Sequence, residues 1–276
     1  MKPAVKREAV QHLQSEHGYS QRRACRLTQC HRETARHTSG RTDDAELRER
    51  LKALAQEHKR WGYRLLTGTL RLEGFTVNHK RVYRLYTEEK LVLRPKHRKR
   101  LKSEKRGPLQ APTRPNQSWT MDFVSDALSD GRPFRTLNII DTYTRQCLHI
   151  EADTSLGGQR VVRALEALVQ QHGTPALIQI DNGPEFRGHA LDVWATQNGV
   201  ELVFIEPGKP TQNAYIESFN SRFRAECLDQ EWFSSLKEAR RVIEEWRVLY
   251  NTLRPHSSLD YLPPDVWAQQ HHSLSL

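Results

Sequence analysis

Residues 119–152 read WTMDFVSDALSDGRPFRTLNIIDTYTRQCLHIEA and contain three runs rich in β-branched and aromatic residues. The runs cover residues 119–128, 134–143 and 147–152, and turn residues such as Gly131 and Pro133 separate the first two. Short runs of this composition with turns between them are typical of strands that pair in chain order. This stretch therefore predicts an antiparallel meander.

The residues that follow alternate between helical and strand patterns. Apolar residues at helical spacing predict helices over 158–171, 187–198 and 212–228, and the runs ALIQI and VELVFI predict two short strands over 176–180 and 200–205. The order β-β-β-α-β-α-β-α describes a mixed sheet flanked by helices. We expect an α/β domain over residues 119–230.

The C-terminal part, residues 231–276, is predicted to contain a helix and an irregular tail. Ser235 and Glu238 have the spacing of a capping box, which predicts that a helix over 236–251 begins there. The tail RPHSSLDYLPPDVW, residues 254–267, is rich in proline. We expect no regular structure in it, because proline removes a backbone donor and fixes φ.

Residues 1–40 are predicted to form short helices over 5–16, 20–28 and 31–38, with Ser20 as an N-cap. Two short helices separated by about three residues fit a helix-turn-helix. They fit a plain three-helix bundle equally well, and both interpretations stay open.

A second helical block is predicted over residues 41–93. Leu47, Leu51, Leu54 and His58 fall on one face of its first helix, and a second helix covers 63–72. Asn78 precedes a third helix over 79–90, in which Val82, Leu85 and Tyr86 form the buried side. The remaining side carries Lys80, Arg81 and Arg84, which suits contact with DNA phosphates and base edges. The alternative is a basic helix that faces only solvent.

The charge is distributed unevenly along the chain. Residues 1–118 hold 29 Lys and Arg against 12 Asp and Glu, whereas the remainder holds 14 against 21. Eight of the thirteen residues over 94–106 are Lys or Arg, and prolines follow, so residues 94–118 are predicted to be a basic linker that lies along DNA. A basic first part and an acidic second part suggest polyanion binding joined to a metal-dependent domain.

Three carboxylates stand out by position. Asp122 interrupts an apolar strand, Asp181 ends a strand before a turn, and Glu217 lies on the helix 212–228, with 35 residues between the last two. Paired strands would make the two aspartates neighbours, and such a set of oxygen ligands suits Mg²⁺. Other acids compete by proximity, so spacing alone does not decide the set: Asp126, Asp141 and Glu185.

The helix 212–228 has two distinct faces. Ile216, Phe219 and Phe223 share the face predicted to pack inward. A second stripe is polar and is predicted to face the metal and the DNA: Asn213, Glu217, Asn220 and Arg224. Lys209 lies just before the helix, in a segment where we expect it to meet a phosphate.

Several motifs resemble one known family. TMDFV, QIDNGPEF and PGKPTQNAYIESFNSRFRAECL are similar to the integrase core of bacterial insertion-sequence transposases, which share the Asp, Asp, 35-residue, Glu signature with retroviral integrases. GYSQRRACRL resembles the start of the second-reading-frame subunit of two-frame elements. The segment HKRWGYRLLTGTLRLEGFTVNHKRVYRLYTEEKLVLR resembles the helix-turn-helix of that subunit, and YNTLRPHSSLDYLPP resembles its C-terminal signature. The resemblance covers nearly the whole chain.

The resemblance implies a ribonuclease H-like mixed-sheet core preceded by an all-α helix-turn-helix region. It implies that Asp122, Asp181 and Glu217 are the catalytic residues and the ligands of two Mg²⁺ ions, for which Mn²⁺ can substitute. The implied activity is cleavage and strand transfer of transposon ends. Alternatives are a ribonuclease H-like nuclease without strand transfer and a DNA-binding regulator without enzymatic activity.

The expected partners follow from this activity. They are transposon-end and target DNA, further copies of the chain on that DNA, and the upstream reading-frame subunit, with which the family's active enzyme is usually fused. No run approaches the roughly 18 apolar residues of a membrane span. We therefore expect a bacterial cytoplasmic protein that associates with the nucleoid when active.

Overall fold

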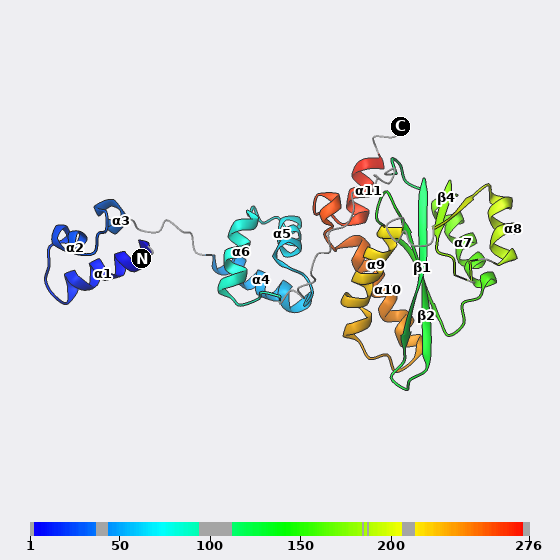
Figure 1. Cartoon of the computed structure of the whole chain (residues 1–276), viewed down its shortest axis with the longest axis horizontal. Coiled ribbons are helices and arrows are strands. Elements are labelled where there is room, and N and C mark those ends of the chain that lie inside the picture. The colour runs from blue at the N-terminus through cyan, green and yellow to red at the C-terminus, as the bar shows by residue number, and fades with distance from the viewer. Residues whose placement is uncertain are drawn as a thin grey trace. The chain divides into compact units, whose positions relative to one another are not determined.

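The computed structural model describes residues 3–36, 44–93, 112–183, 185–186, 188–205 and 213–272 (Figure 1). The chain divides into two compact units, residues 1–48 and 49–276. Within the described residues, no helix combines the length and the apolar character that a membrane crossing requires. The predicted basic linker lies outside the described residues except for its last part, from residue 112, and the predicted domain limits stay predictions.

The first unit contains three short helices around a small core. They are α1 (Pro3–Ser15), α2 (Gln21–Leu27) and α3 (Arg32–Arg36), which confirms the predicted order. Ser20 caps α2, and its side chain accepts a hydrogen bond from the backbone of Arg23. Four buried side chains form the core: Val10, Ala24, Cys25 and Cys30.

The second helical block consists of α4 (Ala45–Glu57), α5 (Tyr63–Leu72) and α6 (His79–Glu88). Asn78 caps α6 as predicted, with its Oδ1 accepting from the backbone of Lys80 at 2.9 Å. The predicted inner faces are all buried: Leu47, Leu51, Leu54 and His58 on and just after α4, and Val82, Leu85 and Tyr86 on α6. The inner faces predicted from the helical periodicity of this block are therefore confirmed.

Helix α5 rests against the C-terminal segment of the chain. A Cβ atom added to Gly68 would lie 2.9 Å from Cβ of Pro255 and 3.2 Å from the carbonyl oxygen of Tyr261. Arg64 also donates a hydrogen bond to the hydroxyl of Tyr261 at 3.4 Å. Gly68 therefore allows a backbone approach that any side chain would prevent.

The catalytic-core candidate is built on a five-stranded mixed sheet. Its strands are β1 (Ser118–Ala127), β2 (Pro133–Asp141), β3 (Cys147–Asp153), β4 (Leu177–Ile180) and β5 (Glu201–Phe204), in the order β3-β2-β1-β4-β5. The first three form the predicted antiparallel meander. Strand β4 adds parallel to β1, and β5 adds parallel to β4.

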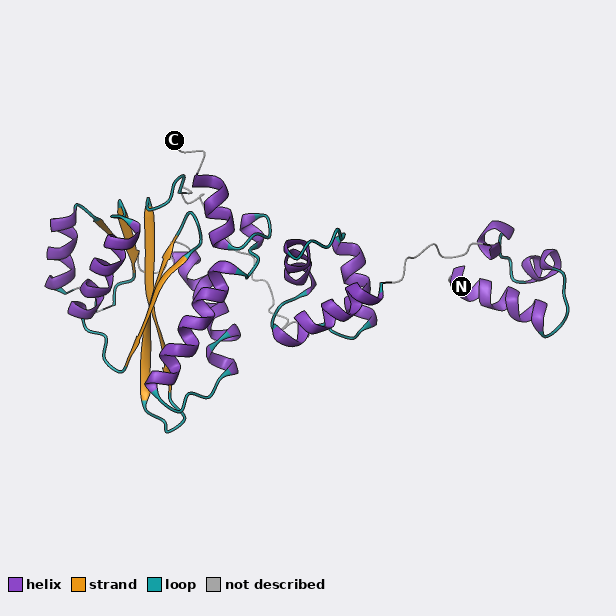
Figure 2. Cartoon of the chain, turned by 180° about the vertical axis from the view of Figure 1, so that it is seen from behind, coloured by secondary structure: helices purple, strands orange, loops and turns teal. Residues whose placement is uncertain are grey.

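Helices cover both faces of this sheet (Figure 2). On one face α7 (Gly158–His172) and α8 (His189–Asn198) pack over a core that includes Trp119 and Met121. On the other face α9 (Ala214–Glu226) and α10 (Leu236–Thr252) pack over Val124. Because side chains of β1 alternate between the faces, Thr120 and Asp122 lie on the side of α9.

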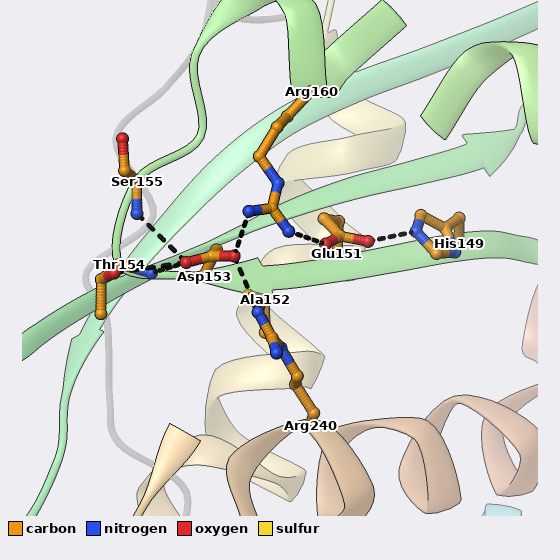
Figure 3. A network of polar contacts seen from close by, with 8 residues as sticks. All are labelled: His149, Glu151, Ala152, Asp153, Thr154, Ser155, Arg160 and Arg240. Atoms are coloured by element: carbon orange, nitrogen blue, oxygen red, sulfur yellow. Dashed lines mark hydrogen bonds and ion pairs between the residues drawn. The ribbon is translucent and has the colours of Figure 1, made fainter. Parts of the chain in front are cut away.

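A polar network fastens β3 to helices on both faces (Figure 3). Arg160 on α7 contacts Asp153 at 2.6 Å and Glu151 at 3.2 Å, and Arg240 on α10 contacts Asp153 at 2.7 Å. Arg240 also donates to the carbonyl oxygen of Ala152 at 2.8 Å. The edge strand is thereby tied to each helical layer by charge-assisted hydrogen bonds.

The prediction of an irregular C-terminal tail was wrong. After the short 3-10 helix Leu228–Gln230 and the capped helix α10, the tail forms a second 3-10 turn, Ser257–Leu259, and then α11 (Pro264–His272). His256 and Leu262 form a bridge between these elements. Pro264 is the first residue of α11, where proline is favoured because the missing N–H would be unpaired in any case.

Candidate active site

Strand pairing places two of the three carboxylates side by side. Ser118, Trp119 and Thr120 of β1 pair in parallel with residues 177–179 of β4. Continuing this register by two residues would set Asp122, in the middle of β1, opposite Asp181, which directly follows β4. Because the register preserves the side-chain alternation, the two residues belong to the same face of the sheet.

The polar stripe of α9 lies along β1. Asn213 accepts a hydrogen bond from Thr120 at 2.6 Å through its Oδ1. Two and three turns further on, Asn220 donates to Oδ2 of Asp122 at 2.8 Å, and Arg224 donates to the carbonyl oxygen of Ser125 at 2.7 Å. Glu217 stands between these contacts, on the exposed part of the helix one turn before Asn220.

The carboxyl group of Asp122 is held in an unfavourable electrostatic position. Burial and the negative charges of Asp181 and Glu217 together raise its pKa to about 6, against hydrogen bonds from the backbone of Phe123 and from Asn220. Mutual repulsion of this kind shows that the three carboxylates share one electrostatic environment. A cation at this place would relieve it.

Two asparagines orient Asp122 through a chain of hydrogen bonds. Asn138 on β2 donates to Oδ1 of Asn220 at 2.7 Å, and Asn220 in turn donates to Asp122. Asn138 is fully buried and is the cross-strand partner of Asp122. Asn138 was not among the residues predicted for the site, although a polar residue inside the apolar run LNII was a signal available from the sequence.

Asp181 is held by the turn that follows β4. Its Oδ1 accepts a hydrogen bond from the backbone N–H of Gly183 at 2.9 Å. A Cβ atom on Gly183 would lie 2.9 Å from that same oxygen and 3.2 Å from Oε2 of Glu185. A side chain at this position would therefore crowd both carboxylates, which would have to move to make room for it.

The three competing acids have structural partners. Asp141 accepts hydrogen bonds from the backbones of Asn116, Tyr143 and Thr144 at 2.7–2.9 Å, and it is 2% exposed. Glu185 forms an ion pair with Arg135. Asp126 accepts from the backbone of Ala127 at 2.8 Å. These contacts explain the presence of the three acids without a metal.

Within the described ranges, no three His, Cys, Asp or Glu side chains are grouped closely enough to hold a metal ion as they stand. Asp122, Asp181 and Glu217 nevertheless interact through their charges. Their oxygen-only chemistry suits a hard divalent cation that keeps water and substrate oxygens among its ligands. The residues fit such an ion as an open set of donors rather than as a closed cage.

The predicted DNA contacts fall in three different settings. Lys80 is exposed at the start of α6, and Arg81 and Arg84 are half-buried further along it. Lys209 lies outside the described residues. Asn213, at 5% exposure, is bonded to Thr120, and Arg224 reaches back to β1, so both side chains brace α9 against the strand. The predicted contact of these two residues with DNA stays a prediction.

Comparison with known proteins matches three parts of the chain to families. Residues 42–100 match an HTH-like domain, and residues 112–210 and 198–264 match two integrase core domain families. The second helical block therefore corresponds to the HTH-like domain. The sheet and the helices that carry the three carboxylates correspond to the integrase core.

Two relatives and one solved structure illustrate the similarity. The chain is 45% identical over 255 residues to the insertion element IS407 uncharacterized 31.7 kDa protein of Burkholderia multivorans, covering 92% of each chain. It is 26% identical to the putative transposase InsK for insertion sequence element IS150 of Escherichia coli, over 82% of this chain and 84% of that one. The fold is similar to that in a simian T-cell lymphotropic virus intasome (TM-score 0.52, 15% identity, 79% of this chain and 74% of that one).

The identity to an insertion-element protein extends over nearly the full length of both chains. The HTH-like and integrase core domains stand in the same order as the helical block and the mixed sheet. The chain therefore belongs to the insertion-element family of integrase-core, transposase-like proteins, and its function is DNA transposition and integration.

Proposed function

We propose that the chain cleaves transposon ends and joins them to target DNA with Asp122, Asp181 and Glu217 as the ligands of two divalent metal ions. The observation that carries the proposal is the packing of α9 along β1, in which Asn220 donates to Oδ2 of Asp122 one turn after Glu217. Mg²⁺ suits these ligands, and Mn²⁺ can replace it. The bound ions would activate the attacking oxygen and stabilise the leaving one.

The residues of the chain contribute alignment and charge. Asp122 must be ionised to act as a ligand, and Asn220 favours that form by donating to Oδ2. Asn138 fixes the orientation of the Asn220 amide. Water attacks a phosphodiester at the transposon end, and the freed 3′-hydroxyl then attacks a second phosphodiester. Phosphoryl transfer of this kind requires positioning and electrostatic stabilisation above all, and no covalent bond to the protein forms.

The proposed DNA contacts begin at the HTH-like domain. Lys80, Arg81 and Arg84 on α6 contact the transposon end, and residues 94–106 run along its phosphates. Lys209 meets a phosphate beside the scissile bond. The chain works as a homo-oligomer on DNA, together with the upstream reading-frame subunit, in the cytoplasm at the nucleoid. The strongly basic composition of residues 1–118 supports these contacts.

A joining assay tests the proposal. Full-length protein, with and without the upstream subunit, is incubated with labelled transposon-end DNA and a target plasmid. We expect joined product with Mg²⁺ or Mn²⁺ and none with EDTA or with Ca²⁺ alone. Cut DNA without any joined product would favour a nuclease instead. DNA binding without either product, in every combination, would favour a regulator.

Asn220→Ala is expected to shift the pH dependence of joining toward higher pH. The substitution removes a hydrogen bond that lowers the pKa of Asp122, so the carboxyl group needs a higher pH to ionise and to hold a cation. For a rise of about one pKa unit, joining should fall by about twofold at pH 7 and by about tenfold at pH 5, and it should recover at pH 8.5. Ser221→Ala, on the exposed side of the same helix, is the control and should leave the profile unchanged. A uniform loss at every pH would mean that Asn220 acts only through folding.

A further inference from the structure

A second polar site lies beside α9, on a different face from the stripe that contacts β1. It is a cavity of about 470 Å³, lined by Arg145, Arg222, Arg254 and His256, together with the hydroxyl-bearing side chains of Tyr215 and Ser218. These residues come from the β2–β3 turn, from α9 and from the segment after α10. Three parts of the chain that are distant in sequence therefore direct cationic groups to one place.

The positive charge of this cavity is only partly neutralised. Glu226 accepts two hydrogen bonds from Arg254, at 2.6 and 2.7 Å, which uses both of its carboxylate oxygens. Arg145 stacks on the ring of Tyr215 at 3.8 Å, and its buried Nη1 has no hydrogen-bond partner among the described residues. Arg222 donates to the carbonyl oxygen of Ser218, a neutral group. Among the described residues, Arg254 therefore forms an ion pair with a carboxylate, whereas Arg145 and Arg222 form none.

His256 is a second, independent sign of a missing ligand. The side chain is 6% exposed, and its Nε2 has no hydrogen-bond partner in the described part of the chain. Burial and the charges of Arg254, Arg222 and Arg145 together lower its pKa to about 2. An unpaired buried polar atom is costly, and three arginine side chains surround this one. An anion in the cavity would offset their charge and would accept a hydrogen bond from the unpaired Nη1 of Arg145.

We propose that this cavity binds a phosphate group of the DNA backbone. Guanidinium groups present donors in a planar fork that matches phosphate oxygens, and the hydroxyl groups of Tyr215 and Ser218 add further donors. Ser218 directly follows Glu217 on α9, so the phosphate is held by the helix that carries the third carboxylate. The inference rests on the proposed action on DNA but not on the assignment of the metal ligands.

DNA binding by full-length Arg222→Ala protein tests the proposal. Binding is measured by fluorescence anisotropy in EDTA, so that no cleavage occurs, over a range of salt concentrations. We expect about tenfold weaker binding, as for the loss of one charge-assisted hydrogen bond. The slope of log K against log salt should fall by about 1, equally for unrelated DNA sequences.

Arg241→Ala is the matched control, because it removes the same charge from an exposed arginine that pairs with Glu245 on α10. It should weaken binding less than twofold. Equal losses for Arg222→Ala and Arg241→Ala would overturn the proposal, since the effect would then come from net charge alone. Circular dichroism of both variants checks that each is folded.

The wild-type protein supplies a second measurement that needs no variant. Nuclear magnetic resonance follows the ring signals of His256, assigned with His256→Gln, during titration with inorganic phosphate and with a short duplex. We expect both to shift these signals. A shift with phosphate alone would overturn the assignment to DNA, and no shift with either would overturn the site itself.

Different results would contradict the proposed metal ligands and the proposed phosphate site. Asp122→Asn protein should lose joining yet retain the response of His256 to the duplex. If Asp122→Asn retained joining, the metal ligands would be wrong while the phosphate site still stood. If it lost the response of His256 while remaining folded, the cavity would not be an independent phosphate site.

Discussion

Asp122→Asn is expected to abolish cleavage and joining while stabilising the protein that holds no metal. The change removes charge from a proposed metal ligand at nearly constant volume. It also removes a carboxylate whose pKa is raised from 3.8 to about 6 by burial and by its acidic neighbours. A raised pKa means that the folded protein loses stability as the pH rises from about 4 to about 6. Above pH 6 the ionised carboxylate lowers the free energy of unfolding by about 3 kcal/mol, because each unit of the raised pKa corresponds to about 1.36 kcal/mol.

Urea unfolding in EDTA at pH 5 and pH 8, beside the joining assay, measures both effects. The free energy of unfolding of Asp122→Asn should exceed that of the wild type at pH 8, with a smaller difference at pH 5. Asp181→Asn and Glu217→Gln should also abolish joining. Near wild-type joining with Mg²⁺ by any of the three variants would remove that residue from the set of ligands.

Asp141→Asn is the control for Asp122→Asn. Asp141 is buried in the same domain, but its carboxylate accepts three backbone hydrogen bonds. Losing this acceptor should lower the free energy of unfolding by about 1–3 kcal/mol. This change is opposite in sign to the one expected for Asp122→Asn. If both variants changed stability in the same direction, the electrostatic argument for Asp122 would fail.

Glu226→Ala is expected to destabilise the protein by about 3–5 kcal/mol, because it leaves the buried guanidinium of Arg254 without its anion. The side chains of the two residues are 10% and 5% exposed, and they share a bidentate contact. Glu226 also accepts a hydrogen bond from Trp61 at 3.4 Å, at the start of the segment that leads into α5. The midpoint of urea unfolding measures the loss.

Two comparisons isolate the buried charge as the cause. Glu245→Ala breaks an exposed pair in which the side chains are 59% and 61% exposed, and such pairs contribute less than about 1 kcal/mol. The double variant Glu226→Leu/Arg254→Met removes both charges and should recover most of the stability. If the double variant were as unstable as Glu226→Ala, lost packing rather than an unpaired charge would explain the effect.

The local elements were predictable because their causes act within a few residues. Apolar periodicity defined α4 and α6, Asn78 and Ser20 marked helix starts, and the runs of β1 to β3 defined the meander. The prediction for the C-terminal tail was wrong because it also used only the local composition. The proline content of the tail predicts irregular structure, whereas Pro264 is the first residue of α11, the helical position at which proline is tolerated.

The sequence by itself determined which elements form, which carboxylates are candidates and where positive charge is concentrated. Only the tertiary structure decided which side chains meet. Extending the register of β1 and β4 by two residues sets Asp122 opposite Asp181, and packing of α9 on β1 brings Asn213 and Arg224 into hydrogen bonds with that strand. The cavity around His256 likewise joins three distant segments. The physical reason is that periodicity and capping are local, whereas these contacts depend on how sheet and helices pack across long separations in the chain.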